Sequence, residues 1–481
     1  MAADFRARYI KYNWASNDER LLERASELTE QLLATYQRRP SKDYLTAFNV
    51  ILTSVQVLHG YTSDYDLLIP TNTNLYSGKT RRNQTYTKEI HTCLKWLIDS
   101  GHLIKNDGIR TYQRHKRAKV IWLPQAYAVS PTLSDKPLAH PKTIYRNPLC
   151  NYVELRQDFV ENKKKITRRI EIPKEQFDLN SKVIEQTNTV LADYDALMRD
   201  VDIQLGGKLL YSAQTSMTRI FSRGDMRLGG RFYSSIQNMK SEARKYLRFD
   251  GDPVIEIDYS SIHPTMLYDY EQQVMDGDPY SIDVFARSDV KVAFNIMLNR
   301  NGGEAQTSAA NTIAEEIHCS KEDAESLEQA IFEKHKSLSK YFNSDYGLKL
   351  QRKDSKLALY ILKHFTQMLK RPIIMIHDSA IVSVRDTESL ILTMKEAYET
   401  VIKDKHNFTS SFKAIKADSL DFPIGLKELV LRSFEGTLNG NGNDYKKEYW
   451  DSCIKECSEE EVPQHYDVSS FTRGAVEDLL L

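Results

Sequence analysis

The sequence predicts an α+β protein in which helices are inserted between the strands of an antiparallel sheet, preceded by a domain of the winged helix-turn-helix type. Residues 254–257 alternate as a strand does, and residues 371–384 contain two apolar strands joined by a tight turn. Residues 283–303, between these strands, have helical spacing. Residues 86–106 form an amphipathic helix, which a short basic hairpin follows at 108–124.

The chain of 481 residues is long enough for several domains, and its composition changes along its length. We expect a helical, winged-helix domain that binds nucleic acid at residues 1–130, and a connecting or thumb-like helical region at 131–225. The strands and inserted helices follow as one core at 226–430. A flexible acidic tail is expected at 431–481.

Charge and cysteine content exclude several classes of protein. The 66 Lys and Arg residues balance 66 Asp and Glu residues, so any basic surface has to be local. The five cysteines include no Cys-x-x-Cys pair, which indicates reduced thiols. The N-terminus is too polar for a signal peptide, and no run of about eighteen apolar residues occurs. These features predict a cytoplasmic protein without a membrane partner and leave its oligomeric state open.

A local excess of positive charge marks the N-terminal domain. Eleven basic residues lie between Lys79 and Lys119, against three acidic ones. This excess favours contact with nucleic-acid phosphates, although a solvated helical face would give a similar pattern. The candidate nucleic-acid contacts in this segment are Arg81, Arg82, Lys88, Arg114, Lys116 and Arg117.

Two aspartates occur where a strand opens into a turn. Asp258 ends the strand of VIEIDYSSIHPTMLY (254–268), and Asp378 lies in the turn of RPIIMIHDSAIVSV (371–384). If both strands present their acids at the same sheet edge, the pair suits two Mg²⁺ ions, with Mn²⁺ as a substitute. Asp is common in turns, so two unrelated turn residues are the alternative.

The helix between these strands carries side chains that could bind a nucleotide. Arg287 and Lys291 are four residues apart, so they share one face. Phe294, Asn295 and Asn299 follow over the next turns. Two cations, an aromatic ring and amides could hold a triphosphate and stack against a base. Arg and Lys at this spacing also occur on ordinary solvated helices.

The order of these elements between residues 229 and 379 resembles that of the family A DNA polymerases. In that family a Gly-Arg, a Gln-Asn and an Arg precede a strand that ends in Asp-Tyr-Ser. This chain has, in the same order, Gly230-Arg231, Gln237-Asn238, Arg244 and Asp258-Tyr259-Ser260. The family's fingers helix (Arg-x3-Lys) and its Val-His-Asp-Glu motif are matched by Arg287, Lys291 and Ile376-His377-Asp378-Ser379.

The resemblance implies a polymerase right-hand fold, with an antiparallel palm sheet and helical fingers inserted between Asp258 and Asp378. Both aspartates would be catalytic metal ligands, and Tyr259 would add its backbone carbonyl. The implied nucleotide-binding residues are Arg287, Lys291, Phe294, Asn295, Asn299 and, beneath the sugar, His263. The implied primer–template contacts are Arg231, Gln237, Asn238, Arg244 and His377. The implied reaction extends a primer 3′-OH with nucleoside triphosphates by two-metal-ion catalysis, without proofreading.

The chain departs from the family pattern at the site itself. His263 stands where the family has the Glu that screens against a ribose 2′-OH, and Ser379 replaces the Glu after the catalytic Asp. The DYSSIHPT segment and Lys291-x3-Asn295 resemble family B instead, but the Asp-Thr-Asp hairpin of that family is missing. We therefore describe a divergent, family A-like palm and fingers. A His263 ring pressed against the sugar would exclude a 2′-OH, whereas a ring turned to offer its nitrogen would accept one; of the two, we expect deoxynucleotides.

Three functions fit these features. The first is template-directed DNA synthesis, with RNA as an alternative template or product. The second is a replication initiator or DNA-binding regulator with a degenerate polymerase core, which Ser379 supports. The third is a template-independent terminal transferase, because the region before residue 225 is short for a thumb. By analogy only, a winged helix joined to a polymerase core suggests a mobile-element or phage-type protein.

Overall fold

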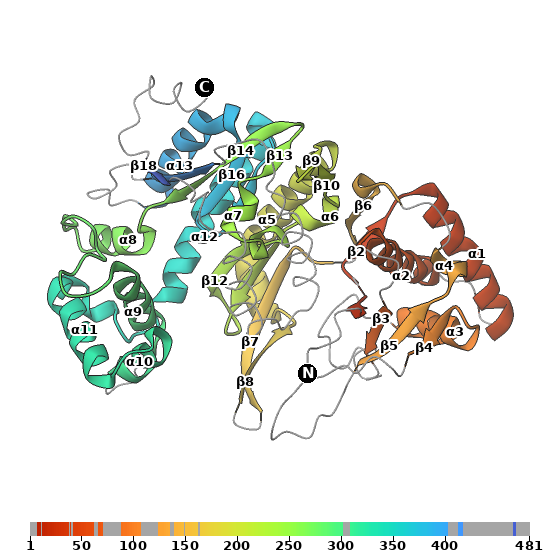
Figure 1. The fold of residues 1–481 in the computed structure, drawn as a ribbon, viewed down its shortest axis with the longest axis horizontal. Helices are drawn as coiled ribbons and strands as arrows, with labels where there is room; N and C mark the ends of the chain where they lie inside the picture. Colours follow the sequence, from red (N-terminus) through yellow and green to blue (C-terminus); the bar gives the residue numbers. More distant parts are fainter. Residues whose placement is uncertain are drawn as a thin grey trace. The chain divides into compact units, whose positions relative to one another are not determined.

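The structure is a computed structural model of the 481-residue chain. It describes residues 7–10, 12–37, 39, 42–61, 66–70, 88–106, 124–134, 139–148, 150–161, 164–301, 308–402, 412–416 and 465–467. This part is a mixed α+β protein, as the sequence predicts (Figure 1). The chain divides into two compact units: unit 1 is Met1–Thr218, Tyr233–Val254 and Ala417–Pro463, and unit 2 is Arg219–Phe232, Ile255–Lys416 and Gln464–Leu481. The four-domain division drawn from the sequence stays a prediction.

Unit 1 begins with three helices that share one hydrophobic core. α1 (Glu19–Tyr36) buries a stripe of apolar residues at helical spacing, namely Leu21, Ala25, Leu28 and Leu32. α2 (Lys42–Tyr61) contacts both α1 and α3 (Lys88–Asp99). The helices expected from the N-terminal periodicity are therefore present.

A small sheet accompanies these helices. Its strand order is β1-β3-β5-β4, formed by Ala7–Tyr9, Asp66–Pro70, Pro124–Val129 and Leu103–Lys105. β4 and β5 pair antiparallel, whereas the basic hairpin predicted at 108–124 lies almost entirely outside the described residues. Gly101 turns the chain from α3 into β4 with a φ of 73°, a left-handed value that favours glycine. Residues 107–123 lie outside the described part of the chain, and the winged-helix assignment stays a prediction.

Among its described residues, the remainder of unit 1 contains antiparallel strand pairs, a long helix and several short ones. The pairs are β2 (Trp14–Ser16) with β6 (Ile144–Arg146), β7 (Val153–Glu161) with β8 (Lys164–Ile170), and β9 (Ile203–Leu205) with both β10 (Lys208–Leu209) and β13 (Leu247–Phe249). The helices are α4 (Pro131–Ser134), α5 (Lys174–Asp200), α6 (Ser212–Thr215) and α7 (Ser241–Arg244).

The sheet of unit 2 is built on β14 (Asp252–Tyr259), which carries Asp258. β14 pairs antiparallel with β17 (Phe412–Lys416), and β17 pairs in turn with β18 (His465–Asp467). β14 also neighbours β16 (Ser379–Ser383), which forms an antiparallel hairpin with β15 (Ile374–Ile376). α13 (Thr387–Val401) follows this hairpin. The predicted strand and hairpin are therefore neighbours in one sheet.

Helices fill the chain between β14 and β15, as the sequence predicts. They are α8 (Ile262–Tyr270), α9 (Arg287–Asn299), α10 (Ala310–Ile317), α11 (Lys321–Lys334) and α12 (Gly347–Lys363). Figure 1 shows α9, α10 and α11 grouped together, and each of them contacts the other two. Within this group the buried ring of Phe294 meets those of Tyr280, His335 and Phe342 edge-on at 5.2 to 5.6 Å.

A pair of neighbouring strands, β11 (Thr218–Ser222) and β12 (Asp225–Tyr233), presents Arg231. Gly230, just before it, has a φ of 84°. A Cβ at Gly230 would lie 2.8 Å from a ring carbon of Phe221 and 3.2 Å from Ser355 Oγ. Any larger residue would strain the backbone and overlap Phe221. The Gly-Arg pair of the sequence thus reflects the close packing of β12.

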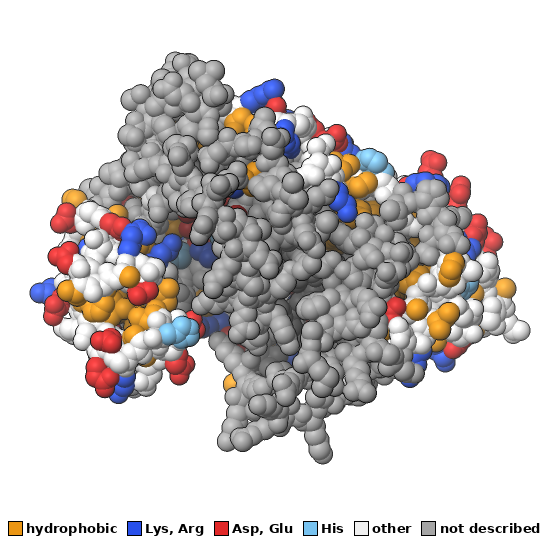
Figure 2. Space-filling view, viewed as in Figure 1, with side chains coloured by type: hydrophobic (Ala, Val, Ile, Leu, Met, Phe, Trp, Pro, Cys, Tyr) orange, Lys and Arg blue, Asp and Glu red, His pale blue; other side chains and the backbone are white. Residues whose placement is uncertain are grey.

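The surface of the helical group carries charges of both signs. Figure 2 shows Lys and Arg side chains interspersed with Asp and Glu there, in keeping with the zero net charge of the chain. Across the described ranges, no helix combines the length and the hydropathy needed to cross a membrane.

Candidate functional site

Asp258 lies near the end of a strand that is otherwise largely buried. Ile255, Glu256, Ile257 and Tyr259 are all buried, whereas Asp258 is half-buried. The Tyr259 hydroxyl donates a hydrogen bond to the Met394 carbonyl of α13. Because side chains alternate along a strand, Glu256 and Asp258 lie on the opposite face from Tyr259. The strand therefore presents two acids away from α13.

Asp378 lies in a two-residue turn between β15 and β16. Ile376 pairs with Ser379, so His377 and Asp378 alone form the turn. His377 has a φ of 58°, in the left-handed region that is uncommon for residues other than glycine. The residues of both strands are buried, while His377 and Asp378 are half-buried. The turn thus exposes its two polar side chains in part at the end of an apolar hairpin.

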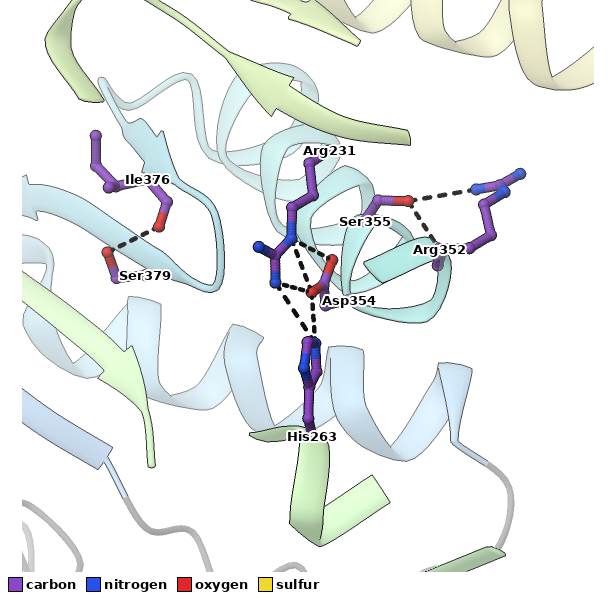
Figure 3. Close-up of polar contacts among 7 residues, drawn as sticks. All are labelled: Arg231, His263, Arg352, Asp354, Ser355, Ile376 and Ser379. Carbon is purple, nitrogen blue, oxygen red and sulfur yellow. Dashed lines mark hydrogen bonds and ion pairs between the residues drawn. The ribbon is translucent and has the colours of Figure 1, made fainter. Parts of the chain in front are cut away.

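A hydrogen bond joins this hairpin to the strand of Asp258. The Ser379 hydroxyl donates to Glu256 Oε1 at 2.8 Å. It also lies 3.1 Å from the Ile376 carbonyl, the contact drawn in Figure 3. Glu256 is two residues before Asp258, and Ser379 directly follows Asp378. Because β14 and β16 are neighbours, the bond places the two aspartates at the same end of adjacent strands.

Both aspartates act electrostatically on one buried tyrosine. Burial raises the pKa of Tyr280, the Arg287 guanidinium lowers it, and the carboxylates of Asp378, Asp278 and Asp258 raise it further. Charges influence a pKa in this way only when they lie near the group. Both strand-end acids therefore lie within electrostatic range of Tyr280, and the guanidinium of Arg287 lies beside its ring.

Arg287 is the first residue of the inserted helix α9 and lies beside Tyr280. Its Nε donates to Asp278 Oδ2 at 2.5 Å, and its Nη2 donates to Oδ1 at 3.3 Å. Its guanidinium carbon lies 5.4 Å from the centre of the Tyr280 ring. Arg287 and Lys291 are both exposed. The predicted cation pair is thus accessible, and one member already binds a carboxylate.

The other residues predicted on α9 differ in their surroundings. Phe294 is fully buried in the aromatic cluster, so its predicted role of stacking on a base does not fit this structure. Asn299 is exposed and donates from Nδ2 to the Asn295 carbonyl at 2.8 Å. A Cβ at Gly347 would collide with the Asn299 amide, so the absence of a side chain at Gly347 makes room for it.

His335 lies in the same aromatic cluster as a neutral imidazole. Its Nε2 lies 2.9 Å from the Pro279 carbonyl, which can only accept, so Nε2 carries the hydrogen. The Tyr268 hydroxyl, 2.8 Å from Nδ1, then donates to that nitrogen. Burial lowers the pKa of His335 to about 4.

We predict that His335 makes the fold sensitive to acid. An unfolded His titrates near 6.5, so between pH 6.5 and about 4 the unfolded chain binds a proton that the folded chain does not. The stability contribution is present above pH 6.5, and about 3 kcal/mol is lost as the pH falls through this window. In urea unfolding, the unfolding free energy of His335→Gln should therefore fall less between pH 7 and 4 than that of the wild type. Equal losses in both proteins would contradict the assignment.

Arg231 and His263 meet on the carboxylate of Asp354, in α12. Arg231 Nε donates to Asp354 Oδ2 at 3.0 Å, and Arg231 Nη2 also pairs with this oxygen. His263 Nε2 lies 3.0 Å from the same oxygen (Figure 3). The Asp354 side chain is only 1% exposed. Two residues predicted to face the substrate are thus joined by a buried acid.

The remaining predicted contacts fall in unit 1 or outside the described residues. Gln237, Asn238 and Arg244 belong to unit 1, where Arg244 Nη1 donates to the Met239 carbonyl at 2.7 Å. Lys88 is the exposed first residue of α3. Arg81, Arg82, Arg114, Lys116 and Arg117 lie outside the residues that the structure describes.

The sequence interpretation missed three residues of this site. Glu256 had a signal, because strand alternation places it on the face of Asp258. Tyr280 lies in an irregular loop, where no periodicity indicates burial. Asp354 belongs to QRKDSKLALY, a charged stretch that is typical of a solvated helical face. Only tertiary packing distinguishes Asp354 from its charged neighbours.

Comparison with known proteins gives this chain no family. No protein-family model matches it, and no curated protein matches it. Within the described residues, no three His, Cys, Asp or Glu side chains form a group that could hold a metal ion. Two carboxylates from adjacent strands nevertheless suit Mg²⁺, which takes one or two carboxylates and completes its shell with water and phosphate oxygens.

Proposed function

We propose that the chain is a nucleotidyltransferase that extends a primer 3′-OH with deoxynucleoside triphosphates under the direction of a DNA template. The observation that carries this proposal is the position of Asp258 and Asp378 at the same end of adjacent strands, which the bond from Ser379 to Glu256 joins. Two acids from adjacent strands suit divalent cations, and the exposed Arg287 at the start of α9 suits phosphate oxygens. The motif order that resembles the family A DNA polymerases supports the same reaction.

Asp258 and Asp378, with the backbone carbonyl of Tyr259, would hold Mg²⁺. When bound, Mg²⁺ stabilises the negative charge on the attacking and leaving oxygens of an in-line phosphoryl transfer. The protein's own part is to keep the two carboxylates fixed. β14 is paired with β17 and neighbours β16, and the bond from Ser379 to Glu256 holds the hairpin to β14. This rigidity matters because a misplacement of about 1 Å can cost about a hundredfold in rate.

Arg287 and Lys291 would neutralise the triphosphate. Arg287 is the first residue of α9, where the helix dipole adds partial positive charge. We expect the triphosphate to displace Asp278 from Arg287, because an exposed carboxylate pair contributes little and a guanidinium binds phosphate bidentately. Asn295 and Asn299 stay candidates for contact with the nucleotide, whereas the buried Phe294 does not.

Candidates for contact with the primer–template are Arg231, Gln237, Asn238, Arg244 and His377. The N-terminal basic segment would bind duplex DNA through its phosphates. Its candidate contacts are Arg81, Arg82, Lys88, Arg114, Lys116 and Arg117. This part of the proposal rests on the local charge excess and on the pairing of β4 with β5.

We predict that the basic segment gives DNA binding much of its salt dependence. Each phosphate contact releases a counterion and contributes about −0.9 to the slope of log K against log salt. A full-length variant with Arg81, Arg82, Arg114, Lys116 and Arg117 replaced by alanine should therefore bind duplex DNA with a slope shallower by about 2 to 4. Fluorescence anisotropy over a salt series measures this slope. A slope equal to that of Lys321→Ala, an exposed control in α11, would contradict the assignment.

The experiment that tests the proposed function is primer extension by the full-length protein. A labelled primer on a longer DNA template, with four deoxynucleotides and Mg²⁺, should be extended to the template's end. Equal extension of the primer without template would favour a terminal transferase. Extension with ribonucleotides alone would favour RNA synthesis. DNA binding without extension under any condition would favour an initiator with a degenerate core.

A further inference from the structure

We infer that Asp354 is a positioning residue for sugar selection, because its carboxylate fixes the ring of His263. The inference rests on the proposed function, in which His263 lies beneath the sugar of the incoming nucleotide. The residue is distant from the aspartates in the sequence and belongs to α12. No motif of the sequence pointed to it.

The geometry defines how the ring is held. A carboxylate oxygen accepts hydrogen bonds, and the guanidinium of Arg231 can only donate. His263 Nε2 lies 3.0 Å from Asp354 Oδ2 and 3.5 Å from Arg231 Nη2. The contact with Asp354 is the shorter of the two and its oxygen can only accept, so the nitrogen carries a hydrogen and donates it to Asp354. This leaves Nδ1 as the ring nitrogen that does not face Asp354.

Burial and charge make this contact strong. The Asp354 side chain is 1% exposed, and those of Arg231 and His263 are 17% and 14% exposed. A buried carboxylate is costly unless it is paired, and Arg231 provides its counter-charge through two nitrogens. The ring of His263 therefore donates to an acceptor that is itself held in place. Water has little access to compete for that hydrogen bond.

The two elements that carry Arg231 and Asp354 are also fastened to each other. Buried Arg219 of β11 donates from Nε to the Gly230 carbonyl at 2.9 Å and from Nη2 to Ser355 Oγ at 3.2 Å. Gly230 adjoins Arg231, and Ser355 adjoins Asp354. Arg352 Nη1 lies 3.4 Å from the same hydroxyl (Figure 3). The acceptor for His263 is thus set by packing between β12 and α12.

A ring held in this way has one consequence for the sugar. Its Nε2 is committed to Asp354, so that atom does not serve as a hydrogen-bond partner for a 2′-hydroxyl. We expect the ring, held in this position, to exclude the hydroxyl by occupying its space rather than to offer it Nδ1. Steric exclusion depends on placement, so a ring that can rotate should admit ribonucleotides more readily.

The test uses the full-length protein and Asp354→Asn, which keeps the shape of the side chain and removes its charge. The quantity measured is kcat/KM for a deoxynucleotide divided by kcat/KM for the matching ribonucleotide, opposite one template base. We expect Asp354→Asn to lower this ratio at least about tenfold, mainly through faster ribonucleotide use. His263→Ala should lower it to a similar extent. The double variant should be no less selective than either single variant, since both changes act through one ring.

The matched control is Asp269→Asn. Asp269 is also fully buried in unit 2, and its Oδ2 accepts a hydrogen bond from the Tyr398 hydroxyl at 2.6 Å. This variant should lose stability and keep the selectivity ratio. If Asp354→Asn does not fold, Asp354→Glu takes its place in the test. This variant retains the charge but displaces the acceptor, so it should lower the ratio several-fold.

The outcomes separate the inference from the proposed function. A wild-type protein that incorporates no nucleotide overturns the proposed function. An active wild type whose ratio is unchanged in Asp354→Asn, or in Asp354→Glu if the former does not fold, overturns only the role of Asp354. Independent, additive effects of Asp354→Asn and His263→Ala also overturn that role. Equal losses of selectivity in Asp354→Asn and Asp269→Asn would mean that Asp354 affects sugar selection only through the general stability of the fold.

Discussion

Replacing Asp258 or Asp378 by asparagine should lower nucleotide incorporation by about a thousandfold. In the proposed function each carboxylate would contribute metal-binding charge that acts mainly in the transition state, and a thousandfold loss corresponds to about 4 kcal/mol of transition-state stabilisation. Asparagine keeps the volume of the side chain but not its charge, so primer–template affinity should change little. Incorporation is measured by rapid quench, and affinity by anisotropy on the same preparations.

The variant with both Asp258 and Asp378 replaced tests whether the two residues act together. If Asp258 and Asp378 serve one centre, the change of both should cost hardly more than the change of one. Asp283→Asn, at an exposed acid shortly before α9, is the matched control and should keep wild-type activity. Near-wild-type incorporation in either single variant with Mg²⁺ would remove that residue from the site.

Replacing Arg287 by alanine should lower kcat/KM for the nucleotide by about ten- to a hundredfold, and Lys291→Ala should do the same. Each change removes a charge-assisted contact worth about 1.5 to 3 kcal/mol. Steady-state kinetics with varied nucleotide at a saturating primer–template measures the loss. Affinity for the primer–template should not follow the same trend, because neither side chain is assigned to it.

Two variants test whether the loss at Arg287 is specific. Lys321→Ala removes an exposed lysine of α11 that pairs with Glu325, and it should leave kcat/KM unchanged. Asp278→Asn releases Arg287 from its carboxylate and should lower the KM for the nucleotide, because the phosphate no longer competes with that acid. Normal kinetics in both Arg287→Ala and Lys291→Ala would make the exposed face of α9 an ordinary solvated surface.

Local sequence patterns were sufficient to predict the elements that carry this site. Alternation predicted β14, and two apolar runs around His377-Asp378 predicted the β15–β16 hairpin. Helical spacing predicted α9 and placed Arg287 and Lys291 on exposed positions. These patterns arise from the burial of side chains within one helix or strand, so they can be recognised in a single sequence. The order of the motifs added the hypothesis that the two acids belong to one centre.

Contacts between distant segments could not be predicted in the same way. Asp354 lies in a charged helical stretch, and its burial depends on Arg231, 123 residues away. Phe294 fitted a stacking role on the sequence, but Tyr280, His335 and Phe342 enclose it. Ser379 looked like a lost acid, whereas the structure places Glu256 within hydrogen-bond distance of its hydroxyl. Each of these outcomes is decided by packing between elements, which no local pattern contains.

The central claim is that Asp258 and Asp378 form a centre for template-directed nucleotidyl transfer. The most direct measurement is single-nucleotide incorporation by the wild-type protein on a primer–template that leaves one template base unpaired. With Mg²⁺, only the complementary deoxynucleotide should be added, and addition should stop in EDTA. Binding of the primer–template without addition of any nucleotide, in either Mg²⁺ or Mn²⁺, would contradict this claim.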